Sequence, residues 1–137
     1  MTFELLKKKI EKSFKETFKS QALGANLILL EEVNSTNLNA LQNSEVFPEG
    51  SVIISLAQTA GRGRKGRSWH SPAGTGLYMS ILLKKMSSIG DSNTFNLLAS
   101  LSVYDALNKE LKSKDESVKK LLELKWPNDI LYDSRKI

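Results

Sequence analysis

The stretch of sequence that decides the fold and chemistry of this chain spans residues 58–69 and reads QTAGRGRKGRSW. Its three glycines stand at alternate or near-alternate positions, so the backbone can turn tightly and aim its N–H groups into one anion-binding concavity. The arginines between them add forked donors that suit phosphate or carboxylate oxygens. Trp69 offers a flat apolar face on which a nucleobase can stack. Composition alone supports an anion-binding loop and a flexible basic loop that contacts nucleic acid about equally.

Neither of the two common nucleotide-binding motifs matches this glycine-rich stretch. It lacks the Gly-Lys-Ser/Thr ending of a P-loop, and its glycine spacing differs from that of a Rossmann fold. The stretch is therefore expected to belong to a long loop, residues 59–75, between two strands rather than to a strand–loop–helix unit.

Short apolar runs on both sides of this loop predict buried strands. The predicted strands are residues 26–33, 51–58, 77–83, 121–125 and 130–132.

Apolar residues that recur every three or four positions predict amphipathic helices over residues 3–20 and 94–111. Asn93 or Thr94 is expected to cap the second of these helices. A brief third helix is expected after Ser35 and Thr36, running to Leu41. The apolar positions are Phe3, Leu6, Ile10, Phe14 and Phe18 in the first helix, and Phe95, Leu98, Leu101 and Leu107 in the second.

Helices and strands therefore mix without strict alternation, which predicts an α+β fold with a mixed, mostly antiparallel sheet on which the helices pack. Trp126, beside Pro127, is expected to lie in the core. The two parts of the chain are assigned as an N-terminal helical segment, residues 1–25, and a core, residues 26–137.

Composition narrows the class of protein. The chain has 137 residues, of which 40% are hydrophobic and 26% charged, as in one ordinary globular domain. It has no cysteine, which excludes disulfides and thiolate chemistry and fits a cytoplasmic location. No apolar run is long enough to span a membrane, and no carboxylate cluster has metal-ligand spacing. The net charge of +5 permits a phosphate ligand, a nucleic acid or an acidic partner.

The glycine-rich stretch, continued through SPAGTGLYMS at residues 71–80, resembles the signature loop of biotin protein ligases. Three further segments resemble family motifs in the same order: residues 35–37 (STN), 125–129 (KWPND) and 135–137 (RKI). The resemblance covers residues 26–137. Lipoate ligases share this fold, which is like that of class II synthetases, but lack the arginine–glycine loop, so the resemblance favours biotin.

The resemblance implies an enzyme, a biotin–[acetyl-CoA-carboxylase] ligase, that activates biotin as biotinyl-5′-AMP and transfers it to a lysine of a biotin carboxyl carrier protein. The substrates would be biotin and ATP, with Mg²⁺ entering on the ATP phosphates. Lys136 and Arg64 are the implied catalytic residues. The implied biotin-binding residues are Ser35, Thr36, Asn37, Gln58, Gly61, Arg62, Gly63, Arg64 and Lys136, and the implied ATP-binding residues are Arg64, Arg67, Trp69 and Asn128.

Most members of this family continue well past the lysine that corresponds to Lys136, so a truncated catalytic domain is expected. Too few residues precede position 26 for the DNA-binding domain of the regulatory members, which favours the non-repressor class. A biotin-binding module without catalysis is the second hypothesis, and a nucleic-acid-binding protein that uses the Arg-Gly loop is a remote third. The sequence leaves a homodimer open.

Overall fold

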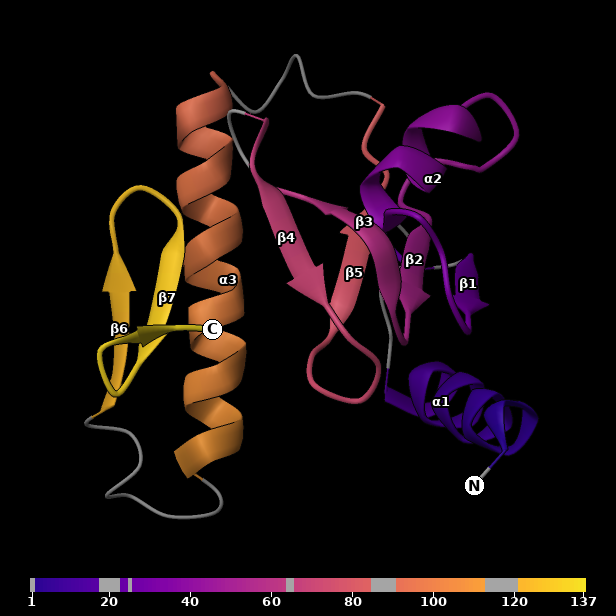
Figure 1. Cartoon of the computed structure of the whole chain (residues 1–137), viewed down its shortest axis with the longest axis horizontal. Coiled ribbons are helices and arrows are strands. Elements are labelled where there is room, and N and C mark those ends of the chain that lie inside the picture. Colours follow the sequence, from indigo (N-terminus) through magenta and orange to yellow (C-terminus); the bar gives the residue numbers. More distant parts are fainter. Residues whose placement is uncertain (1, 18–22, 25, 64–65, 85–90, 113–120) are drawn as a thin grey trace. The chain divides into compact units, whose positions relative to one another are not determined.

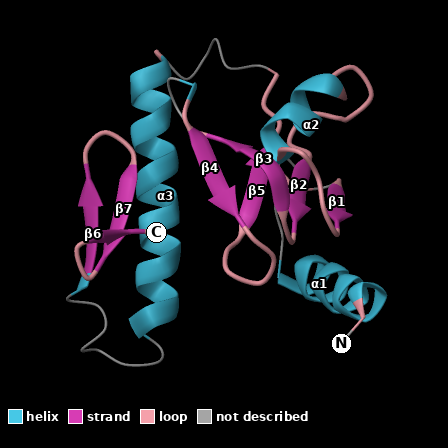
Figure 2. Cartoon of the chain, viewed as in Figure 1, coloured by secondary structure: helices cyan, strands magenta, loops and turns pink. Residues whose placement is uncertain are grey.

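The structure, a computed structural model, describes residues 2–17, 23–24, 26–63, 66–84, 91–112 and 121–137. The chain divides into two compact units, Met1–Lys85 and Met86–Ile137. Helices and strands occur in both units (Figures 1 and 2), and the predicted α+β class is confirmed. None of the helices in the described ranges is long and apolar enough to cross a membrane.

The first unit is built on a three-stranded sheet of order β1-β2-β5 (Figure 1). Its strands are β1 (Leu27–Leu30), β2 (Val52–Ser55) and β5 (Tyr78–Ile81). β1 runs parallel to β2, and β5 pairs antiparallel to it, so the sheet is mixed as predicted. The central strand is the most deeply buried because it has neighbours on both sides, and Ile53 on it is fully buried. The three strands are shorter than predicted.

Helix α2 (Thr36–Gln42) follows β1 and begins where its sequence predicts. Ser35 is the N-cap residue: its backbone is extended, and its side-chain oxygen accepts a hydrogen bond from the N–H of Leu38 at 3.5 Å. A serine at this position satisfies one of the N–H groups that a helix leaves unpaired in its first turn. Ser35 and Thr36 are both buried, so the start of the helix lies inside the unit.

The prediction of one long loop over residues 59–75 is wrong in part, because two segments of this stretch pair as an antiparallel hairpin. Strands β3 (Gln58–Arg62) and β4 (Ser68–Ser71) pair with each other, and a bulge interrupts the ladder between Gln58 and Gly61. Predicted strand 51–58 therefore ends at Ser55, and Gln58 begins a new strand. The glycines hide this hairpin from propensity-based prediction, because glycine is unfavourable in strands unless a bulge or a close approach requires it.

Helix α1 (Phe3–Thr17) carries the predicted apolar stripe, although residues 18–20 of the expected helix lie outside the described part of the chain. None of its described residues is fully buried. The stripe is the better covered face, since its apolar residues are half-buried whereas most of the lysines are exposed. Lys8, Lys9, Lys12 and Lys15 are exposed on the opposite face of the helix.

The second unit combines one long helix with an antiparallel sheet of order β6-β7-β8. Helix α3 spans Ser92–Lys112, and the strands are β6 (Leu122–Lys125), β7 (Asp129–Tyr132) and β8 (Arg135–Lys136). Two residues with positive φ, Asp133 (49°) and Ser134 (60°), connect β7 to β8. Two consecutive residues of this kind form the type I′ turn whose twist suits a tight hairpin.

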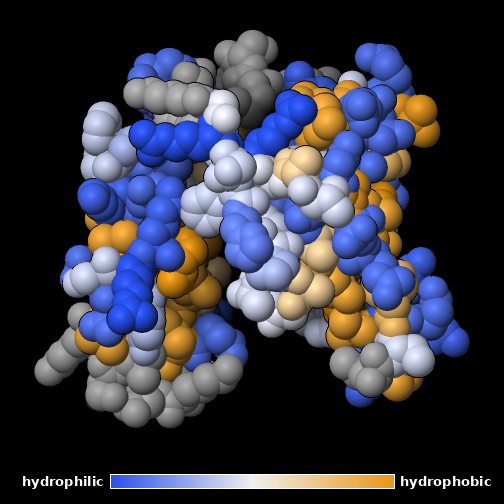
Figure 3. All heavy atoms as spheres, viewed as in Figure 1, coloured by the Kyte–Doolittle hydropathy of each residue, from blue (hydrophilic) through white to orange (hydrophobic). Residues whose placement is uncertain are grey.

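The exposure of two parts of the second unit differs from the sequence-based prediction. Trp126 is 77% exposed rather than in the core, because it lies in the turn beyond the last paired residues of β6 and β7. On α3, Leu98 and Leu101 are exposed, whereas Ser100 is buried. Ser100 can be buried at little cost because its hydroxyl donates to the carbonyl of Asn96 at 2.7 Å. Figure 3 shows the exposed hydrophobic atoms along α3.

Helix α3 is capped by Asp91 and not by Asn93 or Thr94. The Asp91 carboxylate accepts a hydrogen bond from the N–H of Thr94 at 2.8 Å, and its backbone carbonyl accepts from the N–H of Phe95 at 3.1 Å. The backbone hydrogen bond from Thr94 is the main reason why the pKa of Asp91 lies below its ordinary value of 3.8. An ionised cap is also favoured by the positive end of the helix dipole.

The capping contribution of Asp91 should depend on pH. Because the folded-state pKa is lowered, the contribution is fully present above the unfolded value of 3.8 and is lost as pH falls through the lower folded pKa. Asp91→Asn keeps a capping acceptor but does not titrate. We therefore expect helicity, measured by circular dichroism, to fall less steeply below pH 4 in Asp91→Asn than in the parent chain. Equal profiles would contradict the assignment of Asp91 as the cap.

Candidate ligand-binding site

The residues predicted to bind a ligand in the first unit converge because the chain after β1 pairs with the start of β3. Val33 and Gln58 form a parallel bridge, and the N–H of Thr59 donates to the carbonyl of Val33 at 3.0 Å. This pairing places Ser35 and Thr36, which follow directly, beside the side chain of Gln58. Two segments more than twenty residues apart in the sequence thus form one polar site at the N-terminus of α2.

Gln58 is the centre of this site. Its side-chain oxygen Oε1 accepts two hydrogen bonds from Thr36, one from the backbone N–H at 2.8 Å and one from the hydroxyl at 3.2 Å. Its side-chain nitrogen Nε2 donates to Oγ of Ser71 on β4 at 3.0 Å. The hydroxyl of Ser80, on β5, donates to the Thr36 hydroxyl at 2.9 Å. Three strands and one helix therefore contribute polar groups to one cluster.

Gly61 allows the hairpin to close against this cluster. A Cβ atom at residue 61 would lie 2.4 Å from the carbonyl oxygen of Trp69, 2.7 Å from Oγ of Ser71 and 3.2 Å from Nε2 of Gln58. The first two distances are far inside van der Waals contact, and the nearest atom belongs to the backbone, which cannot rotate away. Only glycine fits here without moving β4.

Gly61→Ala should therefore destabilise the first unit, by about 1–3 kcal/mol, the usual cost of overpacking a filled site. The loss would be measured as a change in the free energy of unfolding by urea titration. Gly63→Ala is the matched control, since a Cβ atom there comes no closer than 3.3 Å to Arg67. Its effect should be clearly smaller, and an equal or larger effect in the control would refute the steric argument.

The other predicted residues of the first unit surround the hairpin. Arg62 and Arg67 are exposed, Gly63 donates its N–H to the carbonyl of Arg67 at 2.7 Å, and Arg64 lies outside the described residues. Trp69, expected as a stacking platform, has 40% of its surface exposed on β4 and so presents part of its ring to solvent. Asn37 is exposed in the first turn of α2.

The remaining predicted residues belong to the second unit. Nζ of Lys136 forms an ion pair with Oδ1 of Asp129 at 2.7 Å across the β7–β8 hairpin, with side-chain exposures of 44% and 30%. Asn128 is half-buried in the preceding turn. Asp129 was not singled out by sequence reasoning as a functional residue, although its place in the KWPND motif is a usable signal.

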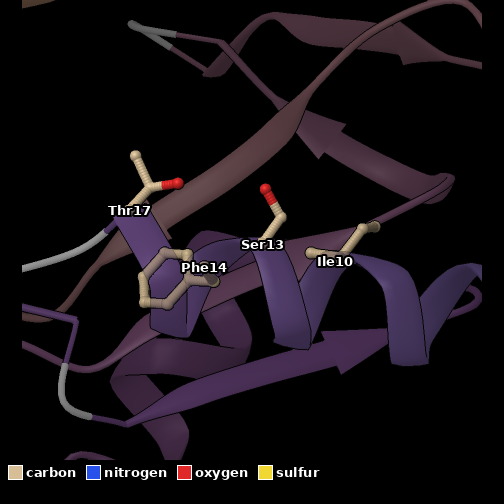
Figure 4. Close-up of a pocket in the computed structure, with 4 residues that line it drawn as sticks. All are labelled: Ile10, Ser13, Phe14 and Thr17. Atoms are coloured by element: carbon tan, nitrogen blue, oxygen red, sulfur yellow. The ribbon is translucent and has the colours of Figure 1, made fainter.

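Ser71 and Ser80 were also missed. They are the two ends of the SPAGTGLYMS stretch, but serine is common in strands and loops, and only the folded chain brings these two to Thr36 and Gln58. In the described residues, no group of three histidine, cysteine or acidic side chains is arranged to hold a metal ion. Among the described residues, a separate pocket is lined by Ile10, Ser13, Phe14 and Thr17 of α1 (Figure 4). None of these four residues is charged, and none is a predicted site residue.

Comparison with known proteins identifies the family to which this chain and its fold belong. The chain is a member of the biotin/lipoate A/B protein ligase family, and the sequence model of this family matches residues 29–137. It is 34% identical over 120 residues to the bifunctional ligase/repressor BirA of Bacillus subtilis, covering 86% of this chain and 34% of that protein. It is 30% identical to the biotin–[acetyl-CoA-carboxylase] ligase of Paracoccus denitrificans, covering 80% of this chain and 43% of that protein.

A solved structure gives the same result for the fold. The biotin protein ligase from Aquifex aeolicus, in complex with biotin and ATP, superposes with a TM-score of 0.67 at 35% identity. The match covers 82% of this chain and 44% of that one. The chain thus spans less than half the length of these relatives.

Proposed function

We propose that this chain supplies the biotin-binding surface and part of the ATP-binding surface of a biotin protein ligase. In the first step, a carboxylate oxygen of biotin attacks the α-phosphorus of ATP, biotinyl-5′-AMP forms and pyrophosphate leaves. In the second step, the amine of a carrier-protein lysine attacks the carbonyl carbon of the adenylate. An amide bond forms, AMP leaves, and the lysine nitrogen loses its extra proton.

The observation that carries this proposal is the polar cluster of Thr36, Gln58, Ser71 and Ser80. Biotin has a ureido ring with one carbonyl oxygen and two N–H groups, and these must be paired once they are buried. One N–H of Gln58 takes no part in the bonds described above, so it can donate to the ureido oxygen. Hydroxyl oxygens in the cluster retain lone pairs for the ureido N–H groups.

The charged residues of the hairpin, and Lys136 on β8, are assigned to the adenylation step. Gly61, Arg62, Gly63 and Arg64 would surround the biotin carboxylate, and Lys136 is assigned to the same step because of its motif. Two anions meet in the adenylation step, so positive groups must offset their repulsion in the transition state. The ATP-binding residues are assigned as Arg64, Arg67, Trp69 and Asn128, with Mg²⁺ carried in by the ATP phosphates.

The protein partner in this proposal is a biotin carboxyl carrier protein, which accepts biotin on a lysine. We place the reaction in the cytoplasm, since ATP is a substrate and the chain contains no cysteine. The proposal needs only one copy of the chain, and sedimentation would show whether a homodimer forms.

Calorimetry with biotin, followed by ATP and an assay for released pyrophosphate, tests the proposal. Binding heat for biotin is expected of the chain itself, and formation of biotinyl-5′-AMP is expected of a version extended to the length of its relatives. Biotin binding without adenylate would instead favour a binding module that lacks catalysis. If neither ligand binds, the proposal is wrong, and binding of single-stranded nucleic acid by the Arg-Gly loop becomes the next hypothesis to test.

A further inference from the structure

From the geometry of the polar cluster we infer that Ser71 and Ser80 are positioning residues that determine ligand specificity, by fixing which atoms of Thr36 and Gln58 face the ligand. This inference deepens the proposed function and rests on it. The groups form a directed chain of hydrogen bonds in which each donor leads to the next acceptor. In order, the chain runs through Ser80 Oγ, Thr36 Oγ1, Gln58 Oε1 and Nε2, Ser71 Oγ and the carbonyl oxygen of Trp69.

Two backbone groups set the direction of this chain. The backbone N–H of Thr36 can only donate, so the atom of Gln58 that it meets at 2.8 Å must be the carbonyl oxygen. The side-chain nitrogen of Gln58 then necessarily faces Ser71. At the other end, the carbonyl oxygen of Trp69 can only accept, at 3.3 Å, so it takes the single proton of Ser71. Oγ of Ser71 must therefore accept from Gln58, which agrees with the orientation set by Thr36.

Ser80 completes the arrangement at the opposite end. Thr36 gives its only hydroxyl proton to Gln58, so the bond of 2.9 Å between the two hydroxyls must use the proton of Ser80. Without Ser80, the Thr36 hydroxyl loses one of the contacts that hold it toward Gln58. It could then rotate and offer its proton elsewhere.

The consequence is a site with fixed polarity. The groups that take no part in the chain are one N–H of Gln58 and lone pairs on the hydroxyl oxygens. A ligand that presents one acceptor between two donors fits this pattern, whereas a ligand that presents a donor in place of the acceptor would meet the Gln58 N–H with another N–H. Ser71 and Thr36 are only 3% and 4% exposed, so water cannot readily compensate for a mismatch.

The first experiment needs no ligand and tests the hydrogen-bond chain itself. Amide hydrogen exchange at Thr36 should be slow in the parent chain, because its N–H is bonded to Gln58. In Ser71→Ala the Gln58 side chain loses one anchor, and exchange at Thr36 should become about 10-fold faster. Ser55→Ala is the matched control, since Ser55 is equally buried but donates to the carbonyl of Ala57. Unchanged exchange in Ser71→Ala, or an equal rise in the control, would overturn the inference.

The second experiment compares the affinities for biotin and for 2-iminobiotin, in which the ureido oxygen is replaced by a nitrogen that carries hydrogen. The parent chain should prefer biotin. In Ser80→Ala this preference should fall about 10-fold, the scale of one misplaced hydrogen bond. Ser80→Thr, which keeps the hydroxyl in a residue suited to strands, should restore it. If Ser80 had only a structural role, Ser80→Ala would weaken the binding of both ligands equally. The ratio of the two affinities would then stay unchanged, which would refute the specificity role.

The two experiments separate the inference from the function on which it rests. If the parent chain binds neither ligand while Thr36 exchange responds as expected, the hydrogen-bond chain is real and the biotin assignment is wrong. If biotin binds well but the preference is unaffected by Ser80→Ala, the biotin assignment holds and the specificity role is wrong.

Discussion

Lys136→Ala should lower the rate of biotin adenylation by about 100-fold or more, the scale for removing one preorganised electrostatic contact from a transition state. Charge accumulates only as the biotin carboxylate approaches the α-phosphate, so biotin affinity in the absence of ATP should change much less. The measurement is single-turnover formation of biotinyl-5′-AMP, in a version of the chain extended to the length of its relatives, together with a biotin titration.

The matched control is Lys109→Ala, which removes an exposed lysine from α3 in the same unit. Lys136→Ala also breaks the ion pair with Asp129, but a partly exposed pair of this kind contributes only about 0–1 kcal/mol to stability. Loss of folding therefore cannot account for a 100-fold effect, and urea unfolding would verify this. Adenylation by Lys136→Ala at the parental rate would show that the catalytic lysine has been assigned wrongly.

Gln58→Ala should show the reverse pattern and weaken biotin binding by about 100-fold. The substitution removes the donor proposed for the ureido oxygen, and it leaves the N–H of Thr36 buried without its acceptor. Losing a hydrogen bond to a buried polar group of the ligand costs about 1–3 kcal/mol, and the upper part of this range corresponds to roughly 100-fold in affinity. Isothermal titration with biotin measures the effect directly.

Gln58→Glu refines this test because the carboxylate can still accept from Thr36 but has no N–H to donate. It should retain the fold while binding biotin almost as weakly as Gln58→Ala. Gln42→Ala, at the exposed end of α2, is the control and should bind like the parent. If Gln58→Glu binds biotin as tightly as the parent, the donor role assigned to Gln58 is refuted.

The strands flanking the signature loop were predictable because strands in a sheet need runs rich in apolar residues, such as Val52–Ile54 in β2 and the mostly apolar residues of β5. Helix α2 was predictable from the capping preference of Ser35. The β3–β4 hairpin was not predictable, because Gly61 and the two glycines that follow it are unfavourable in strands. The geometry of β3 depends on the close approach of Gly61 to Trp69 and Ser71. The exposure of Trp126 was also missed, since its hydrophobicity predicts burial whereas its place in a turn decides otherwise.

For the candidate site, motif resemblance identified Thr36 and Gln58 but could not assign what they contact. Their mutual hydrogen bonds depend on the bridge between Val33 and Gln58, which joins segments far apart in the sequence. The cap of α3 shows the same limit, since Asp91 caps this helix rather than Asn93 or Thr94. Residues 91–94 are four polar residues in a row that are all candidates by type, and only the backbone hydrogen bonds select one.

By itself, the sequence determined the family of this protein, its α+β class and the residue types of its candidate site. Motif order and hydrophobic periodicity are properties of the chain that need no coordinates. The tertiary structure alone decided the polarity of the site, through Ser71 and Ser80, and the ion pair of Lys136 with Asp129. The physical reason is that a hydrogen bond depends on direction and on a separation of about 3 Å, and only packing of distant segments sets these.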